Sequence, residues 1–209
     1  MQVLMINGSP HPKGCTFTAL SEIARSLAEE QIESEILWIG SKPARSCIAC
    51  EKCKNPRKNR CIFDDDMVNL ALEKLEQAQG LIVGSPVHYA AASGLITSFL
   101  GRLFYSGKNL AAYKPGAAIV SCRRAGSTAA LEQLNKFFTI NNMPLVSSQY
   151  WNMVHGMTPD EVKQDLEGMQ TMRTLGKNMA WLLRSIEAGK QAGIQRPEQE
   201  PQARTNFIR

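Results

Sequence analysis

Short apolar runs alternate along the chain with segments in which apolar residues recur every three or four positions. The continuous runs predict strands at residues 2–6, 34–40, 80–86, 116–122 and 143–148. The helical spacing predicts helices over residues 16–30, 64–79, 93–106, 127–142 and 158–189. Because strands and helices alternate, the pattern predicts an α/β fold, a five-stranded parallel sheet with helices on both faces.

Polar residues mark where two of these helices begin. The acidic run before residue 67 places Asp64 or Asp65 as N-cap of the helix over 64–79, since carboxylates suit free N–H groups. Thr158 and Pro159 are predicted to be the N-cap and first residue of the long final helix.

We expect residues 1–190, which contain all the predicted strands and helices, to form one domain. The polar segment 191–209 is expected to be an extended or partner-docked tail.

Composition and charge narrow the classes of function. The 209 residues are 44% hydrophobic and 21% charged, which is ordinary for a protein with a substantial core. A net charge of +5 is too mild for a nucleic-acid-binding signature. The first apolar run is too short for a signal peptide or a membrane span, so we expect a cytoplasmic protein with no membrane or nucleic-acid partner.

The turn after the first strand, NGSPHPKGCT at residues 7–16, has the composition of a phosphate site. Free N–H groups at the start of the following helix attract anions. Ser9 and Thr16 add hydroxyl groups, and Lys13 adds a positive charge. The turn matches neither the Walker loop nor the dinucleotide fingerprint, and it suits one terminal phosphate. An ordinary turn with capping residues is the alternative.

Similar loops follow the third and fourth predicted strands. They read GSPVHYAAASG at residues 84–94 and SCRRAGST at residues 121–128. Because ligands of open parallel sheets lie beyond the carboxyl ends of the strands, the three loops are expected to share one crevice. A flat aromatic ligand is expected to lie against Pro86, Val87, His88 and Tyr89, unless these residues simply pack within the loop.

Four of the six cysteines are crowded into residues 46–61, as SCIACEKCKNPRKNRC. Cys47, Cys50, Cys53 and Cys61 have the spacing C-x2-C-x2-C-x7-C, and its compact first part favours a [4Fe–4S] cluster. Zinc and a set of disulfides or free thiols remain alternatives, although zinc sites usually separate their cysteine pairs more widely. The basic segment 54–60 suits docking of an acidic electron donor or compensation of the negative charge of a cluster, and a solvated loop is the alternative. Cys122 is read as a buried structural thiol.

Several stretches together resemble one known family. INGSPHPKGCT, SCIACEKC, CIFDDDM, GLIVGSPVHYAAASGLITSFLGRLF and SCRRAGS resemble the NADPH-dependent FMN reductase group of the flavodoxin-like superfamily, and within it the iron–sulfur flavoproteins. The resemblance implies a flavodoxin-like sheet of order 2-1-3-4-5 that binds FMN.

The resemblance also assigns roles to residues. It implies phosphate contacts from Ser9, Lys13, Gly14, Cys15 and Thr16, ring contacts from Ser85, Pro86, Val87, His88 and Tyr89, and contacts at the other ring edge from Arg123, Arg124 and Gly126. Cys15 stands where relatives usually have Asn, and His88 where Tyr is frequent. Both changes bear on individual contacts rather than on the cofactor.

These observations lead to one expected function, an FMN-dependent oxidoreductase that takes electrons from NAD(P)H or a reduced ferredoxin-like carrier. The cluster is expected to lie on its path to an acceptor. A non-enzymatic electron carrier and a thiol redox sensor are the alternatives. No side chain has a clear acid–base role, so none is assigned to catalysis. The resemblance further implies a homodimer or homotetramer.

Overall fold

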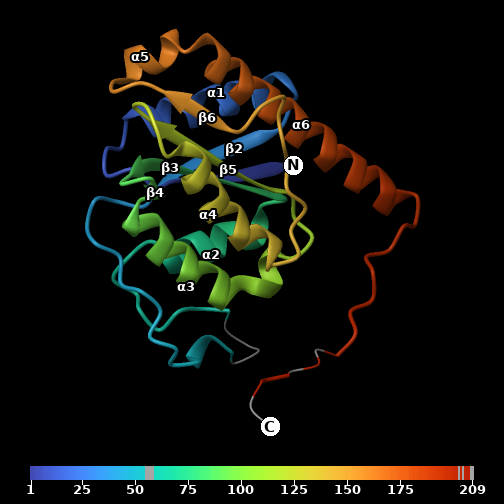
Figure 1. Ribbon diagram of the computed structural model, residues 1–209. Coiled ribbons are helices and arrows are strands. Elements are labelled where there is room, and N and C mark those ends of the chain that lie inside the picture. Colours follow the sequence, from blue (N-terminus) through green and yellow to red (C-terminus); the bar gives the residue numbers. More distant parts are fainter. Residues whose placement is uncertain (55–58, 202, 204, 208–209) are drawn as a thin grey trace.

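A computed structural model describes residues 1–54, 59–201, 203 and 205–207 as a three-layer α/β fold (Figure 1). The five parallel strands are β1 (Gln2–Asn7), β2 (Glu33–Trp38), β3 (Gly80–His88), β5 (Gly116–Cys122) and β6 (Met153–His155). They lie in the order β2-β1-β3-β5-β6, and β4 (Ala91–Ala92) pairs antiparallel with the end of β3. The α/β class and the parallel sheet are confirmed.

The predicted five-stranded sheet of order 2-1-3-4-5 is wrong in two respects. The sheet has six strands, because the chain reverses after β3 at Tyr89 and Ala90, whose φ angles are 50° and 58°, and so forms β4. Positive φ at both central residues is what a two-residue hairpin of type I′ requires.

The last parallel strand also lies later than residues 143–148, which make a single bridge, between Leu145 and Gly116. Ser148 Oγ donates to Tyr150 O at 2.6 Å, and this hydrogen bond holds a turn that delays the pairing until Met153.

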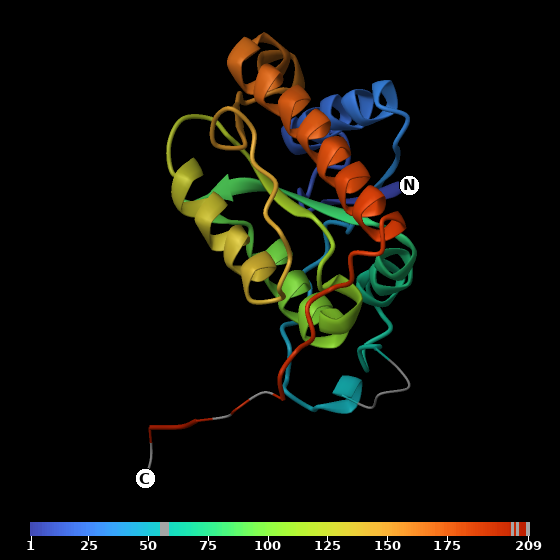
Figure 2. The same cartoon turned by 90° about the vertical axis from the view of Figure 1, so that its right-hand side faces the viewer.

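Helices cover both faces of the sheet. One face carries α1 (Cys15–Glu29), α5 (Pro159–Gln164) and α6 (Leu166–Gln191), and the other carries α2 (Val68–Gln77), α3 (Gly94–Ala111) and α4 (Ser127–Thr139) (Figures 1 and 2). Each layer has its own apolar core. A short 3-10 helix, η1 (Lys52–Lys54), lies in the cysteine-rich loop.

Two predicted helix boundaries are corrected. The helix over 64–79 begins at Val68, and neither Asp64 nor Asp65 is its N-cap, because Asp66 Oδ1 already accepts from Val68 N at 3.1 Å. The helix over 158–189 is two helices, separated at Asp165, whose carboxylate accepts from Gly168 N at 2.9 Å. Thr158 is confirmed as the N-cap of α5, since its hydroxyl accepts from Glu161 N.

After α6 the chain runs past the C-terminal end of α3 without further helix or strand in the described residues (Figure 2). Its contacts there are with Tyr113, whose ring lies 5.5 Å from the Arg196 guanidinium and whose hydroxyl accepts from Gln199 at 3.2 Å. Docking of this tail on a partner stays a prediction. Among the helices described, none is both long and apolar enough to cross a bilayer.

Candidate functional site

Three loops meet at the carboxyl edge of β1, β3 and β5, as the parallel pairing requires. Ser93 Oγ, after β4, donates to Gly8 O at 3.1 Å and joins the first loop to the second. Thr16 Oγ1 and Ser121 Oγ lie 2.9 Å apart and join the first loop to the end of β5. The convergence predicted from the sequence is therefore present.

The first loop is ordered by its own backbone and by its neighbours. Asn7 Oδ1 accepts from Ser9 N at 3.1 Å, and Ser9 Oγ accepts from His11 N at 3.1 Å. Trp38, at the end of β2, donates from Nε1 to Ser9 O at 2.9 Å. The sequence reading missed Asn7 and Trp38, because a buried strand-end amide and a half-exposed indole carry no motif.

The end of this loop leaves a helix terminus open. Gly14 is the N-cap of α1 and has no side chain with which to accept from the first turn. Lys13 beside it is exposed. Unpaired N–H groups together with a nearby cation suit an anion such as phosphate.

Cys15 and Thr16 turn their side chains toward the protein. The Cys15 thiol donates to Gly156 O, 3.7 Å away, in the loop after β6, and burial raises the pKa of this thiol. Thr16 is buried and bonded to Ser121. Through their side chains these residues tie loops together, while their backbone N–H groups belong to the open first turn of α1.

The second loop carries the residues predicted to lie along a flat ring. Ser85 is buried, and its hydroxyl donates to Pro86 O at 2.8 Å and accepts from Ser93 N at 3.0 Å. Pro86 and Val87 are half-buried, whereas His88 and Tyr89 are exposed at the tip. Ser85 thus holds the strand end in shape, and the residues after it form the outer wall.

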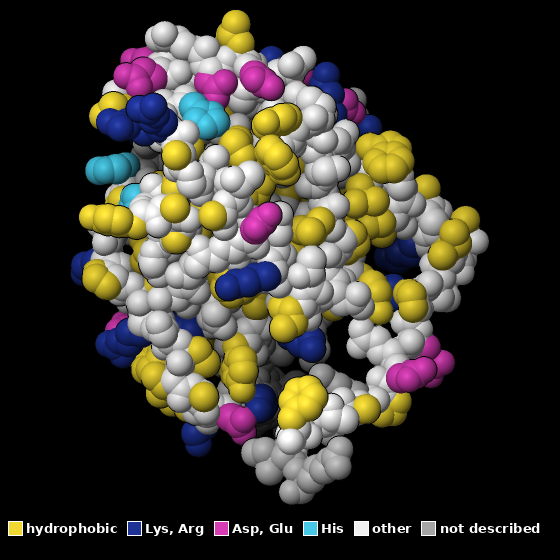
Figure 3. All heavy atoms as spheres, viewed as in Figure 1, with side chains coloured by type: hydrophobic (Ala, Val, Ile, Leu, Met, Phe, Trp, Pro, Cys, Tyr) yellow, Lys and Arg dark blue, Asp and Glu magenta, His cyan; other side chains and the backbone are white. Residues whose placement is uncertain are grey.

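The third loop closes against the second. Gly126, the N-cap of α4, has φ +86°, and a Cβ there would lie 2.5 Å from Ala90 Cα. Arg123 and Arg124 are exposed beside this second open helix terminus. Basic side chains and histidines lie along this edge of the molecule (Figure 3). Exposed basic side chains therefore flank this helix terminus.

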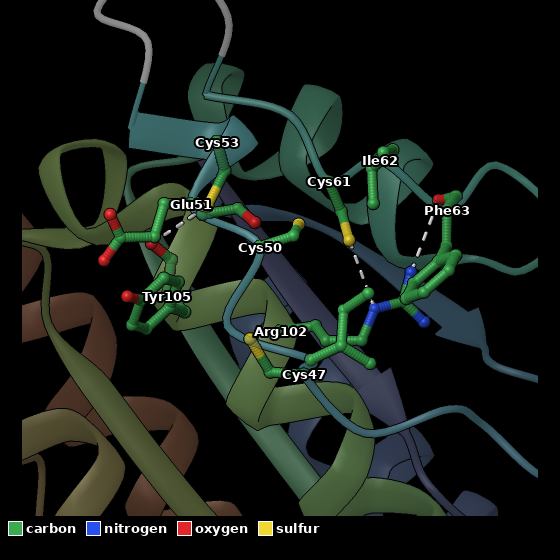
Figure 4. A pocket seen from close by; sticks show the side chains of 11 residues that line it. Cys47, Cys50, Glu51, Cys53, Cys61, Ile62, Phe63, Arg102 and Tyr105 are labelled. Carbon is green, nitrogen blue, oxygen red and sulfur yellow. Dashed lines mark hydrogen bonds between the residues drawn. The ribbon is translucent and has the colours of Figure 1, made fainter.

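The four clustered cysteines lie elsewhere, in one hollow against α3 (Figure 4). The hollow is narrow and partly open to solvent. Cys47, Cys50 and Cys53 come from one arm of the loop and Cys61 from the other, and Arg102 and Tyr105 of α3 form the floor. All six cysteines of the chain are free.

The four thiols suit a cluster in number and kind, but they are not arranged as ligands. Within the described residues, no three His, Cys, Asp or Glu side chains are placed to hold a metal ion. Cys53 Sγ is 3.9 Å from Tyr105 O, and Cys47 Sγ accepts from Ala49 N at 3.4 Å. Four free thiols that share one hollow nevertheless form the donor set that iron–sulfur clusters use.

Three basic residues around the cysteine hollow form ion pairs with acidic side chains. Arg45 contacts Asp65 at 2.6 Å, Lys54 pairs with Glu51, and Arg60 contacts Glu73 at 2.7 Å. Residues 55–58, the middle of the predicted basic segment, lie outside the described residues. Arg45, Lys54 and Arg60 thus pair with acidic side chains, whereas compensation of a cluster's charge and docking of an acidic donor stay predictions.

Two residues of the hollow were missed from the sequence. Arg102 and Tyr105 were read as part of an ordinary helix, yet they are three residues apart and share one helix face. Arg102 follows Phe99 by three positions and precedes Leu103, both of which are buried, so its place on the apolar face was a readable signal. Cys122 is buried, as predicted.

Sequence comparison decides the family. The pattern of the family described as NADPH-dependent FMN reductase matches residues 1–158. The chain belongs to this family. An iron-sulfur flavoprotein of Methanocaldococcus jannaschii is 32% identical over 195 residues, which cover 90% of this chain and 100% of the relative. One of Methanosarcina thermophila is 27% identical over 195 residues, 91% of this chain and 99% of the relative.

Solved structures agree on the fold of this FMN reductase family member. RosB, solved with bound 8-demethyl-8-formylriboflavin-5'-phosphate, superposes with a TM-score of 0.69 at 14% identity and covers 100% of this chain and 92% of its own. A flavodoxin from the domain Archaea gives a TM-score of 0.59 at 14% identity, over 88% of this chain and 99% of its own. At such identities the likeness establishes a flavodoxin-like fold.

Proposed function

We propose that this FMN reductase family member binds FMN in the sheet-edge crevice and a [4Fe–4S] cluster in the cysteine hollow. It then acts as an oxidoreductase that takes electrons from NAD(P)H or a reduced ferredoxin-like carrier. The observation that carries the proposal is the meeting of three loops around two open helix termini. The family match and the relatives' names support it.

For FMN, the phosphate belongs at the start of α1. Backbone N–H groups of Cys15 and Thr16, with Lys13 beside them, would hold it, while Ser9 shapes the loop from within. The ring would lie along Pro86, Val87, His88 and Tyr89, with Arg123, Arg124 and Gly126 at its other edge. Bound flavin supplies hydride and single-electron chemistry, and the chain orients it and shields one face.

For the cluster, the ligands would be Cys47, Cys50, Cys53 and Cys61. The two arms that carry them would have to move to bring the thiols into ligand positions, since no three thiols are placed as ligands within the described residues. The hollow lies along α3 from the three loops, because α3 begins after Ser93, which contacts the first loop, and carries Arg102 to the cysteines. At 1.5 Å per residue, the nine steps from Ser93 to Arg102 rise roughly 14 Å.

A second candidate, a non-enzymatic electron carrier, is favoured by the iron-sulfur flavoprotein names of the relatives. The two functions differ in one measurement. An NAD(P)H oxidoreductase consumes nicotinamide with a small acceptor, whereas a carrier is reduced quickly by ferredoxin and turns over no nicotinamide. In either case we propose a cytoplasmic homodimer or homotetramer, which light scattering on the purified protein measures.

The proposed function is tested by anaerobic purification followed by a visible spectrum and assays for iron and acid-labile sulfide. We expect flavin absorption with close to one FMN per chain, and about four iron and four sulfide per chain. Replacing Cys47, Cys50 and Cys53 together by Ser should remove iron and leave FMN in place. A colourless protein that takes up no added FMN would refute the proposal.

A further inference from the structure

Arg102 is a fully buried cation at the base of the cysteine hollow (Figure 4). Its side chain is 1% exposed. Its Nε donates to Cys61 Sγ at 3.3 Å, one terminal nitrogen pairs with Asp66, and the other donates to Phe63 O at 3.3 Å. All three partners lie on residues 61–66, the arm that carries the fourth cysteine.

The Phe63 ring of this arm lies close to two guanidinium groups. Arg102 Cζ is 5.1 Å from the ring centroid, and Arg45 Cζ is 5.0 Å from it. Arg45 differs from Arg102 in being 58% exposed, and it pairs with Asp65, which is 55% exposed. The chain therefore holds one arginine–aspartate pair inside the hollow and a comparable pair outside it.

A buried ion pair is a poor source of stability. Removing two charges from water costs several kcal/mol, and apolar residues of similar size often serve the fold as well or better. Asp66 balances the charge of Arg102, yet neither pairing with Asp66 nor packing requires that Nε point at a sulfur. A purely structural role of Arg102 therefore does not explain why its Nε donates to Cys61 Sγ.

We propose that Arg102 is a positioning residue of the cysteine site, which holds Cys61 for ligation and donates a hydrogen bond to its sulfur in the loaded protein. This inference rests on the proposed function and deepens it. Hydrogen bonds to ligand sulfurs and nearby positive charge raise the reduction potential of iron–sulfur clusters. Partners of metal ligands also secure the metal, typically by a factor of 10 to 100.

The same helix places the other arm. Cys53 Sγ is 3.9 Å from Tyr105 O, one turn after Arg102. Ser46, just before Cys47, lies 3.1 Å from Ser98, one turn before Arg102. Both arms of the loop therefore contact α3, and Arg102 contacts the arm that contributes only Cys61.

The test compares two charge-neutral double variants. Arg102→Met with Asp66→Asn removes the buried pair, and Arg45→Met with Asp65→Asn removes the exposed pair on the same ring. After anaerobic purification, each is assayed for iron per FMN, the rate of iron loss to a chelator and the cluster's reduction potential. We expect the first variant to lose iron roughly ten- to a hundredfold faster and to have a more negative potential. The second should match the wild type.

Arg102→Lys serves as a second variant that keeps a charge beside Asp66. Its single ammonium group lacks the Nε donor, so a more negative potential is still expected. Circular dichroism and FMN content show that each variant is folded. Wild-type iron loss and potential in both Arg102 variants would overturn this inference and leave the proposed function standing. Wild-type protein that holds FMN without iron or sulfide would instead refute the cluster, and the role of Arg102 with it.

Discussion

At the scale of single residues, the meeting of the three loops depends on a few positions where only one kind of residue fits. Gly126 combines a positive φ of +86° with a Cβ position 2.5 Å from Ala90 Cα. Gly193, after α6, has nearly the same φ, +84°, but nothing lies within 4 Å of its Cβ position. A side chain at either glycine would strain the backbone, but only at Gly126 would it also clash with a neighbouring residue.

Gly126→Ala should lower the free energy of unfolding by about 2–4 kcal/mol, since left-handed strain of about 1–2 kcal/mol adds to a clash with backbone. It should also weaken FMN binding, because the second and third loops are forced apart. Gly193→Ala should cost only the strain. Urea unfolding and flavin fluorescence titration measure both effects. Equal losses in the two variants would show that the Ala90 contact has no role.

The residue scale is also where sequence reading was least complete. Cys15 and Thr16 were predicted to contact a phosphate; they form the start of α1, and their side chains bond to Gly156 and Ser121. Such long-range partners leave no local pattern. In the sequence, Arg102 resembles any other basic residue of a helix, and only its spacing from the buried Phe99 and Leu103 indicates that it faces the core.

At the scale of elements, α1 is positioned by α6. Ser26 Oγ donates to Arg173 O at 2.8 Å, and Arg173 contacts Glu22 at 2.7 Å. Gly176 allows this close packing, because a Cβ there would lie 2.8 Å from Ser26 Cβ and 3.1 Å from Ile23 O. Since α1 begins at the first loop, its placement would set the proposed phosphate contacts.

Gly176→Ala should destabilise the protein by about 1–3 kcal/mol and weaken FMN binding by displacing α1. Gly101→Ala, in α3, is the matched control, as nothing lies within 4 Å of that Cβ position. It should stabilise the fold by up to about 1 kcal/mol through helix propensity. Thermal unfolding and FMN titration measure these effects, and a neutral Gly176→Ala would contradict the packing argument.

Strands and helices with strong patterns were predictable, and those set by tertiary contacts were not. Residues 2–6, 80–86 and 116–122 are long apolar runs, and each proved to be a central strand. The last strand was misplaced, since Ser148 and its hydrogen bonds, not apolarity, decide where pairing resumes. The break of the final helix at Asp165 depends on His155 N, which donates to its carboxylate at 2.7 Å from another element.

At the scale of the whole molecule, the thiols outside the cysteine hollow make stability depend on pH. Burial raises the pKa of both Cys15 and Cys122 above the ordinary value of 9.0. The folded state therefore keeps their protons when the unfolded state has lost them. Their contribution is complete below pH 9.0 and is lost as pH rises through the folded pKa values.

The free energy of unfolding should therefore fall above about pH 9, with a slope of up to about 1.4 kcal/mol per pH unit for each thiol. In the variant with Cys15→Ala and Cys122→Ala, this part of the slope should vanish. Denaturant unfolding between pH 7 and 10.5 measures it, with other alkaline groups common to both proteins. Parallel curves for the two would rule out these thiols as the source.

The hydrogen bonds that join the three loops have one more consequence. They join protein groups to each other, Ser93 to Gly8 and Thr16 to Ser121, and involve no ligand atom. Under the proposed function, the three loops would therefore already be joined before FMN binds, and its binding would not have to assemble them.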